Sequence, residues 1–285
     1  MVKLGLIGQS IQKSSAPLLH TLLGELHNIP VMYDLHEPAD KSPEAFAFTL
    51  NRLREEGYTG CNVTFPYKQI AINHATNTNE AVKRVGSTNT LSFIGETVGA
   101  ANTDYSGFIR GFKSRLGEQP AGKVLLIGAG GVGRAIAFAL FDVGATQVMI
   151  YDVHEESARS LSESMCAAGL NARFVTKNDI GDAAMDADGL VNCTPIGHYK
   201  TPGNPLDQSL FGPQSWAFDA VYTPVDTEFL QVAHQKQMTI VSGFDLFLYQ
   251  GLDAFTIFTG QAVDAPSVLA RFKEKFNVKS QFISY

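Results

Sequence analysis

One stretch of the sequence decides the fold: KVLLIGAGGVG, residues 123–133. Its apolar half has the length of a buried strand, and its glycines follow the G-x-G-x-x-G spacing of a strand that turns into a helix. In that pattern Gly128 permits a tight turn, Gly130 lets the backbone approach a diphosphate, and Gly133 permits close packing of the helix on the strand. N–H groups at the helix start would bind the phosphates. The stretch predicts a dinucleotide-binding loop made of Gly128, Ala129, Gly130, Gly131, Val132 and Gly133.

The competing interpretation of these glycines is a turn that serves packing alone, but the end of the next predicted strand favours a cofactor. Asp152 lies about twenty residues beyond the loop, where an acid binds the ribose hydroxyls in NAD enzymes. NADP sites place cations there, whereas residues 151–156 (YDVHEE) hold carboxylates that would repel a 2′-phosphate. We therefore predict NAD rather than NADP. Asp152 could also cap a helix starting near His154, and Arg159 is the nearest cation.

Predicted strands and helices alternate on both sides of the loop, which indicates an α/β protein. Strands are expected at residues 2–7, 31–35, 61–64, 91–94, 97–100, 124–127, 148–151, 172–175, 190–193, 217–219 and 239–241. Helices are expected at residues 18–27, 43–56, 102–116, 132–143, 244–259 and 266–276. A chain of 285 residues is long for one core, so two domains are expected. We predict a substrate-binding and catalytic α/β domain at 1–103, completed by C-terminal helices within 244–285 that pack back on it, and a Rossmann-type doubly wound dinucleotide-binding domain at 104–243.

The composition argues against several classes of protein. The formal net charge of −6 does not suit a nucleic-acid surface, which needs clustered Lys and Arg. No apolar run reaches the roughly 18 residues of a membrane span, and the N-terminus lacks the pattern of a signal peptide. Cys61, Cys166 and Cys193 fit neither a zinc site nor a redox pair, so a reducing cytoplasm is expected. The histidines lack metal-binding spacing, so we expect no metal site and place His20 on a helix surface.

Residues capable of acid–base chemistry follow two predicted strands in the N-terminal half. Lys68 comes shortly after the strand that carries Asn62 and Thr64, and Asp104 stands near a helix start. Asn62 and Thr64 alternate along their strand, so they are expected to face the same cleft. Lysine is usually a solvated surface residue, and Asp104 could be a simple helix cap. A Lys–Asp ion pair in a closed cleft would instead orient the ammonium for proton transfer.

Taken together, these motifs resemble the shikimate and quinate dehydrogenase family. The matching segments, in chain order, are Gly8–Pro17, Asn62–Lys68, Gly86–Thr90, Asn102–Gly107, Gly128–Gly133, Asn192–Gly197, Ala220–Pro224 and Gly243–Gln250. They run through nearly the whole chain, and eight ordered matches are far more specific than any single motif. The chain is therefore identified as a member of this family.

The resemblance implies a role for each matched residue. Lys68 and Asp104 would form the catalytic pair, with Lys68 passing the proton to or from the reacting oxygen. The substrate contacts it implies are Ser14 and Thr64 at the carboxylate, Lys68, Asn89, Asp104 and Gln250 at the ring hydroxyls, and Tyr222 at the mouth of the site. Near the nicotinamide side of the cofactor it implies Thr194, Val221 and Gly243.

Two positions depart from the family pattern. The family loop carries two hydroxyl residues, two positions apart, that both touch the substrate carboxylate, whereas this chain has Ser14 and then Ala16. The missing donor to an anion would weaken binding by about 1.5–3 kcal/mol. Either shikimate binds weakly, or the true substrate differs around C1, as quinate does with its extra hydroxyl. NADP members of the family have Asn-Arg-Thr or Asn-Arg-Ser where this chain has residues 151–153 (YDV), which agrees with NAD.

We therefore expect an NAD-dependent dehydrogenase that interconverts shikimate with 3-dehydroshikimate, quinate with 3-dehydroquinate, or both, by hydride transfer at C3. NAD use favours an oxidative, catabolic direction. Two alternatives stay open: a dehydrogenase of a related substrate such as an aminated shikimate analogue, and a sensor that binds quinate or shikimate and NAD without turnover. The expected partners are small molecules, with neither nucleic acid nor membrane, and the protein is expected to be a monomer or a homodimer.

Overall fold

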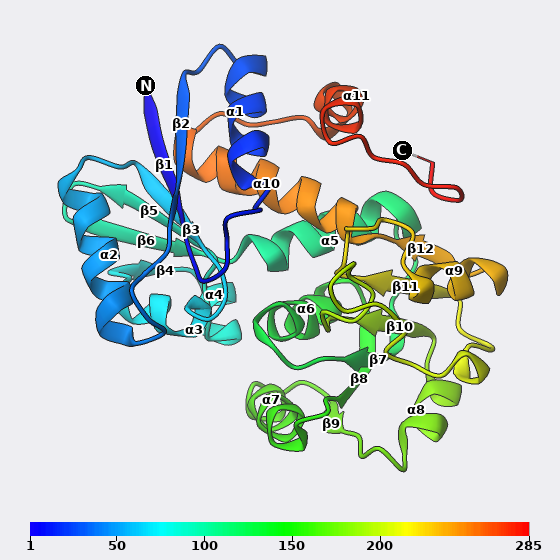
Figure 1. The fold of residues 1–285 in the computed structure, drawn as a ribbon. Coiled ribbons are helices and arrows are strands. Elements are labelled where there is room, and N and C mark those ends of the chain that lie inside the picture. Colours follow the sequence, from blue (N-terminus) through cyan, green and yellow to red (C-terminus); the bar gives the residue numbers. More distant parts are fainter. Residues whose placement is uncertain (285) are drawn as a thin grey trace. The chain divides into compact units, whose positions relative to one another are not determined.

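The computed structural model of the chain describes residues 1–284, and it has the predicted α/β fold (Figure 1). The chain divides into two compact units. The first contains Met1–Ser106 and Tyr249–Lys275, and the second contains Gly107–Leu248 together with residues 276–284. This division differs from the sequence-based one in grouping the residues after Lys275 with the central part of the chain. The functions assigned to the two predicted domains stay predictions.

A six-stranded mixed sheet forms the centre of the first unit, with the strand order β2-β1-β3-β5-β6-β4. Its strands are β1 (Val2–Ile7), β2 (Val31–His36), β3 (Gly60–Val63), β4 (Asn77–Thr78), β5 (Thr90–Ile94) and β6 (Thr97–Ala101). β1 pairs in parallel with β2 and β3, whereas β5 and β6, which match the strands expected at 91–94 and 97–100, form an antiparallel hairpin. The helices between these strands are α1 (Ala16–Leu26), α2 (Pro43–Glu55), α3 (Lys68–Ala71), the 3-10 helix η1 (Ile72–His74) and α4 (Glu80–Val85).

Helix α2 illustrates why the elements form where they do. Ser42 caps the helix because its Oγ accepts a hydrogen bond from Ala45 N at 3.1 Å. Phe46, Leu50 and Leu53 recur at helical spacing and are buried. These side chains belong to the same core cluster as residues of β1, β3 and β5. These three side chains therefore form the face of α2 that covers the sheet.

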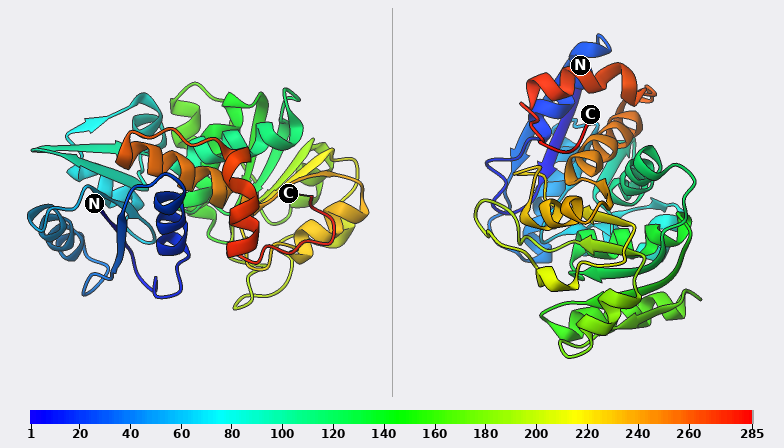
Figure 2. Two further views of the ribbon diagram at one scale, coloured as in Figure 1. Left: turned by 90° about the horizontal axis from the view of Figure 1, so that it is seen from above. Right: turned by 90° about the vertical axis from the view of Figure 1, so that its right-hand side faces the viewer.

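The second unit contains the predicted Rossmann-type sheet. Its strands are β7 (Gly122–Ile127), β8 (Ala145–Tyr151), β9 (Ala172–Phe174), β10 (Gly189–Asn192), β11 (Trp216–Asp219) and β12 (Thr239–Val241). They are all parallel, in the order β12-β11-β10-β7-β8-β9, which is the order of a doubly wound dinucleotide fold. Its helices are α6 (Gly131–Asp142), α7 (Glu155–Ala167), α8 (Ile180–Asp186), the 3-10 helix η2 (Gln208–Leu210) and α9 (Glu228–Gln235). α6 and α7 lie on one face of the sheet, and α8 and α9 lie on the other (Figures 1 and 2).

The remaining helices are α5 (Thr103–Leu116), α10 (Gly243–Thr259) and α11 (Ala265–Lys275). α5 and α10 each begin in one unit and end in the other. In the first unit they are joined by a hydrogen bond from Ser106 Oγ to Asp253 Oδ2, and in the second by an ion pair between Arg115 and Asp245 at 2.8 Å. α11 packs against α1, so the predicted return of the last helices to the N-terminal part of the chain is confirmed for Tyr249–Lys275.

Candidate active site

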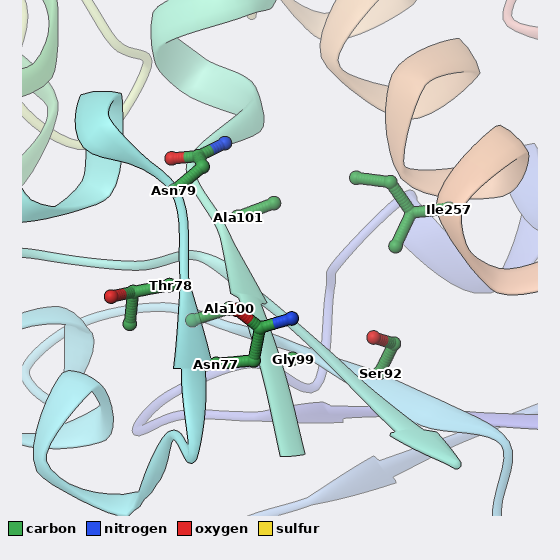
Figure 3. A pocket seen from close by; sticks show the side chains of 8 residues that line it. All are labelled: Asn77, Thr78, Asn79, Ser92, Gly99, Ala100, Ala101 and Ile257. Carbon is green, nitrogen blue, oxygen red and sulfur yellow. The ribbon is translucent and has the colours of Figure 1, made fainter. Parts of the chain in front are cut away.

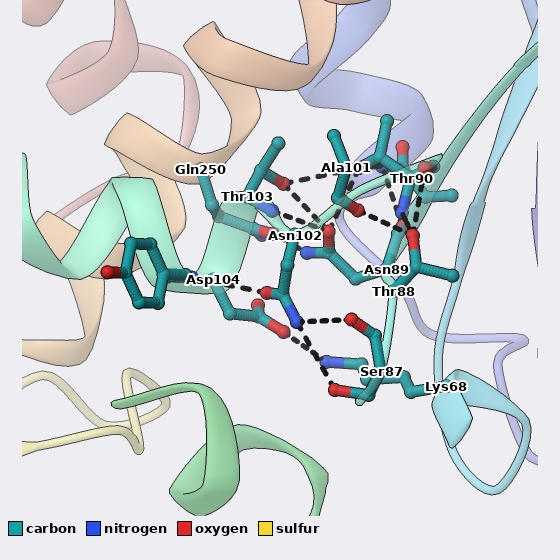
Figure 4. Close-up of polar contacts among 12 residues, drawn as sticks. Lys68, Ser87, Thr88, Asn89, Thr90, Ala101, Asn102, Thr103, Asp104 and Gln250 are labelled. Carbon is teal, nitrogen blue, oxygen red and sulfur yellow. Dashed lines mark hydrogen bonds and ion pairs between the residues drawn. The ribbon is translucent and has the colours of Figure 1, made fainter. Parts of the chain in front are cut away.

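Lys68 and Asp104 form an ion pair that is largely shielded from solvent (Figure 4). The distance from Lys68 Nζ to Asp104 Oδ2 is 2.5 Å, and the two side chains are 12% and 7% exposed. Lys68 is the first residue of α3, and Asp104 lies in the first turn of α5. A lysine is almost never buried without a partner, so Lys68 is not the solvated surface residue of the competing interpretation.

The backbone on either side of Lys68 is held in place by neighbouring segments. Lys68 O accepts a hydrogen bond from Thr88 N at 2.9 Å. The preceding residue, Tyr67, is fully buried, and its hydroxyl donates to Asp40 O and accepts from Gln9 Nε2. Because Gln9 belongs to the loop after β1, these bonds tie the start of α3 to two other loops. These hydrogen bonds therefore fix the backbone from which the Lys68 side chain projects.

Asn102, and not Asp104, caps the start of α5. Asn102 Oδ1 accepts a hydrogen bond from Tyr105 N at 3.2 Å, and its Nδ2 donates to Ser87 O at 3.1 Å. Both groups of the Asn102 amide are thus used to fix the end of β6 and the first turn of the helix. The Asp104 carboxylate instead accepts a hydrogen bond from Lys68, so Asp104 is not a simple helix cap.

Asn89 joins the start of α5 to α10. Its Oδ1 accepts from Thr103 N at 2.7 Å, and its Nδ2 donates to Gln250 Oε1 at 3.3 Å, although Asn89 and Gln250 are 161 positions apart in the sequence. Thr103 directly precedes Asp104, so the hydrogen bonds of Asn89 lie next to the Lys68–Asp104 ion pair (Figure 4). The first unit therefore brings together four of the residues predicted to contact the substrate: Lys68, Asn89, Asp104 and Gln250.

Ser14 and Thr64, the residues predicted to bind a carboxylate, are both half-buried in the first unit. Ser14 Oγ accepts a hydrogen bond from Ala16 N at 3.2 Å, at the turn into α1. Thr64 follows β3 and lies directly against Gly8, where a Cβ would come within 2.3 Å of Thr64 Cγ2. Gly8 therefore has to be glycine for the first loop to pass this close to the end of β3. The binding of a carboxylate by these residues stays a prediction.

The expectation that His20 lies on a helix surface is wrong. Its side chain is 2% exposed, and its ring stacks on Tyr33 at 4.9 Å. Burial lowers the pKa of His20 to about 3, so the imidazole is neutral near pH 7. Tyr33 in turn donates to Asn62 Oδ1 at 2.8 Å, and Asn62 Nδ2 donates to Asn89 O at 3.3 Å. The signal that could have placed His20 inside is its position one helical turn before buried Leu23.

The predicted dinucleotide loop has the expected strand–turn–helix geometry in the second unit. Gly128 follows β7 with a φ of +100°, which favours glycine. Gly130 is the N-cap of α6, whose first turn contains Gly131, Val132 and Gly133. A Cβ on Gly133 would lie 1.9 Å from Gly128 O, so no larger residue fits there. The first turn of α6 thus presents backbone N–H groups at the loop, as binding of a diphosphate requires.

Asp152 lies beside this loop at the end of β8. Its Oδ2 accepts from Ala129 N at 2.7 Å, and its Oδ1 accepts from His154 N at 2.8 Å. The N-cap of α7 is His154, so Asp152 stands outside that helix and is not its N-cap residue. The guanidinium of Arg159 lies over the Phe174 ring, 4.1 Å from its centroid, so an aromatic ring engages the nearest cation in the sequence.

The residues predicted near the nicotinamide, Thr194, Val221 and Gly243, follow the carboxyl ends of β10, β11 and β12. Ligands of open parallel sheets bind at this edge. Asn192 Oδ1 accepts from Thr194 N at 2.9 Å, and Asp219 Oδ1 accepts from Val221 N at 2.9 Å. Burial raises the pKa of Asp219 to about 7, although its hydrogen bonds act in the opposite direction.

Tyr222, predicted at the mouth of the substrate site, belongs to the second unit. Its ring stacks on Phe247 at 4.8 Å, and Phe247 also meets Phe276 edge-on at 5.2 Å. Phe244 and Phe247 are both buried, so their rings serve packing. The contact of Tyr222 with a substrate stays a prediction.

A pocket of about 180 Å³ lies elsewhere in the first unit (Figure 3). The residues that line it are Asn77, Thr78, Asn79, Ser92, Gly99, Ala100, Ala101 and Ile257. None of them is a predicted site residue, so this pocket is distinct from the Lys68–Asp104 site. Within residues 1–284 no three His, Cys, Asp or Glu side chains are placed to hold a metal ion, and no helix is long and apolar enough to cross a membrane.

Comparison with known proteins places these observations in a family. A family model described as the shikimate dehydrogenase substrate binding domain matches residues 6–91, and the alanine dehydrogenase/PNT C-terminal domain matches residues 98–203. The NADP-type shikimate dehydrogenase of Pseudarthrobacter chlorophenolicus is 33% identical, over 95% of this chain and 94% of the relative. The chain belongs to the shikimate/quinate dehydrogenase family. The NAD-type quinate/shikimate dehydrogenase of Corynebacterium efficiens is 32% identical, over 95% of this chain and 97% of the relative.

Solved structures of the family share the whole fold. Quinate dehydrogenase from Corynebacterium glutamicum in complex with NAD has a TM-score of 0.88 and 31% identity, covering 97% of this chain and 98% of that one. Shikimate dehydrogenase from Thermus thermophilus, in complex with NADP(H) and shikimate, has a TM-score of 0.83 and 29% identity, covering 96% and 100%. The family therefore includes enzymes of both cofactor types and both substrates, and membership alone decides neither for this chain.

Proposed function

We propose that this chain is a dehydrogenase that transfers hydride between a nicotinamide cofactor and C3 of shikimate, quinate or both. The observation that carries the proposal is the shielded Lys68–Asp104 ion pair, which lies beside the amide side chains of Asn89 and Gln250. A substrate with several ring hydroxyls needs such partners, because a buried polar group left unpaired costs about 1–3 kcal/mol. Relatives at 32–33% identity that are named for these substrates support the same reaction.

In this proposal Lys68 moves one proton while its neighbours hold the ring. In the reductive direction the Lys68 ammonium gives a proton to the C3 oxygen, and in the oxidative direction Nζ takes it back. Asp104, 2.5 Å from Nζ, keeps the ammonium aimed and balances its charge. Asp104, Asn89 and Gln250 bind the ring hydroxyls. The remaining assignments are Ser14 and Thr64 at the carboxylate and Tyr222 at the mouth of the site.

NAD is the proposed cofactor, and it supplies the hydride acceptor or donor when bound. The loop from Gly128 to Gly133 fits a diphosphate, because only glycine fits at its two ends and because α6 begins within it. Asp152 is fixed beside the loop, and an acid at this position suits ribose hydroxyls better than a 2′-phosphate. Thr194, Val221 and Gly243 are assigned to the nicotinamide side.

Initial-rate kinetics on the purified protein test this proposal. Shikimate and quinate are each paired with NAD and with NADP, and kcat/KM is measured from nicotinamide absorbance. We expect turnover with NAD that exceeds turnover with NADP by at least about tenfold. A preference for NADP would contradict the Asp152 argument and leave the family assignment intact. If none of the four pairs is turned over, aminated shikimate analogues are tested next as substrates. If these also give no turnover, the protein is tested as a sensor that binds its ligands without turnover.

Replacing Ala16 with serine is expected to raise kcat/KM for shikimate by about tenfold, since one hydrogen bond to an anion is worth about 1.5–3 kcal/mol. Ala16 is half-buried, and its N–H already bonds Ser14 Oγ, so a hydroxyl there would stand beside that of Ser14. The same kinetics with quinate separate the two explanations for Ala16. Quinate turnover that also rises means that a donor was missing, whereas a fall means that the space serves the C1 hydroxyl. Unchanged kinetics for both acids would contradict a carboxylate site at this loop.

A further inference from the structure

Asp219 is a fully buried acid that has no role in the proposed reaction. It ends β11, and its Oδ1 accepts from Asn192 Nδ2 and Val221 N, both at 2.9 Å. Its Oδ2 accepts from Thr227 Oγ1 at 2.6 Å, and Thr227 is the N-cap of α9. A buried carboxylate stabilises a fold poorly compared with apolar packing. The role of Asp219 is therefore inferred from the segments that its hydrogen bonds hold in place.

Through Asn192, Asp219 controls the segment that contains Thr194. The Asn192 amide uses its Nδ2 on Asp219 and on Ile196 O, the latter at 3.0 Å. This orientation points Asn192 Oδ1 at Thr194, where it accepts from the backbone N at 2.9 Å and from Oγ1 at 2.7 Å. If the amide were turned over, its donor would face the Thr194 N–H, and the hydrogen bond from the Thr194 backbone would be lost.

Through Val221, Asp219 also controls the position at which α10 begins. Asp219 Oδ1 holds Val221 N, and Asn192 O holds Ala220 N at 2.8 Å. A Cβ on Gly243 would lie 2.5 Å from Val221 O and 2.6 Å from Ala220 O. The first residue of α10 therefore rests directly on the segment that Asp219 fixes.

We infer that Asp219 is a positioning residue that sets the three segments carrying Thr194, Val221 and Gly243 in the arrangement that binds the nicotinamide end of the cofactor. The inference rests on the proposed function, since that function assigns these three residues to the cofactor. Asp219 itself touches no substrate or cofactor atom in this role. One buried carboxyl group organises the carboxyl ends of β10, β11 and β12 together.

The test is the dissociation constant of reduced cofactor, NADH or NADPH, measured by nicotinamide fluorescence on the full chain. We expect Asp219→Ala to weaken it at least about tenfold, because both the Asn192 and the Val221 contacts lose their acceptor. Asp219→Asn keeps Oδ1 for both contacts, and its new amide can donate to Thr227 Oγ1. We expect this conservative variant to bind within about threefold of wild type. The substrate KM at saturating cofactor is expected to change less than about twofold in both.

Gln214 provides the matched control at the opposite end of β11. It is also buried and hydrogen-bonded, to Ala184 O at 2.6 Å and to Gly212 N at 2.7 Å. Gln214→Ala is expected to lower Tm without changing cofactor affinity. The inference is overturned if folded Asp219→Ala binds like wild type, or if Gln214→Ala weakens binding equally.

A second variant keeps the test valid if Asp219→Ala does not fold. Asn192→Ala removes the link between Asp219 and Thr194, together with the hydrogen bond to Ile196 O, and leaves the contact of Asp219 with Val221 N in place. We expect it to weaken cofactor binding about tenfold. Affinity equal to that of wild type overturns the inference and leaves the proposed function standing. Wild-type protein that binds neither NADH nor NADPH overturns the proposed function and the inference with it.

Discussion

Replacing Lys68 with alanine is expected to lower kcat about a thousandfold while the protein still binds its nicotinamide cofactor. The variant removes the group that exchanges a proton with the C3 oxygen, and a positioned acid or base contributes about 10²–10⁴-fold. Asp104→Asn keeps the shape of its partner and removes the charge that aims the ammonium, so a smaller loss of about tenfold to a hundredfold is expected. The measurements are kcat with shikimate and quinate, and the dissociation constant of NADH by fluorescence.

Lys83 provides a matched control for Lys68 within the same unit. It also pairs with an acid, Glu80, at 2.8 Å, but the two side chains are 58% and 84% exposed. Lys83→Ala is therefore expected to leave kcat unchanged. Lys68→Ala strands the buried Asp104 carboxylate, so Tm is measured beside kcat, and the double variant Lys68→Ala/Asp104→Asn removes that uncompensated charge. If folded Lys68→Ala retained more than about a tenth of wild-type kcat, Lys68 would not be the proton donor.

Much of the fold could be predicted because its signals are local. The pattern at residues 123–133 places β7 and α6 within one or two residues of their observed bounds, and the strands expected at 91–94 and 97–100 match β5 and β6. Three short helices, α4, α8 and α9, were missed. α4 illustrates the reason: Asn79 and Gly86 cap it at both ends, but six residues are too few for a periodic apolar stripe.

The candidate site was predictable in its chemistry but not in its contacts. Sequence motifs placed Lys68 and Asp104 at the ends of apolar runs, and the fold brings them to 2.5 Å. The motifs gave no indication that Asn62 uses its amide on Tyr33 and Asn89, because alternation along a strand shows only which face a side chain occupies. The sequence misplaces His20 for a related reason, since a histidine in an apolar helix gives the same pattern whether its ring contacts water or other rings. Such long-range partners become visible only when the chain is folded.

The cofactor preference is expected to reverse when Asp152 is replaced by serine and Val153 by arginine. The serine removes the negative charge beside the loop, and Val153, 75% exposed, can carry a guanidinium without disturbing the core. Loss of the charged acceptor for the ribose hydroxyls should lower kcat/KM with NAD about a hundredfold, since hydrogen bonds to charged groups are worth about 1.5–3 kcal/mol each. With NADP, removal of the repulsion and a new partner for the 2′-phosphate should raise kcat/KM at least tenfold. Kinetics with both cofactors check the reversal.

Glu156→Gln separates the local role of Asp152 from the general negative charge of this segment. Glu156 is exposed in the first turn of α7, whereas Asp152 is bonded to the loop itself through Ala129 N. If charge alone excluded NADP, Glu156→Gln and Asp152→Ser would change the ratio of kcat/KM with NADP to kcat/KM with NAD by similar factors at low salt. Added salt would then erase both effects. If Asp152 selects NAD by binding the ribose, Glu156→Gln should leave the ratio within about twofold of wild type, and the effect of Asp152→Ser should persist at high salt. Persistence is the expected result, because two backbone hydrogen bonds hold the Asp152 carboxylate beside the loop, where the proposal has it bind the ribose.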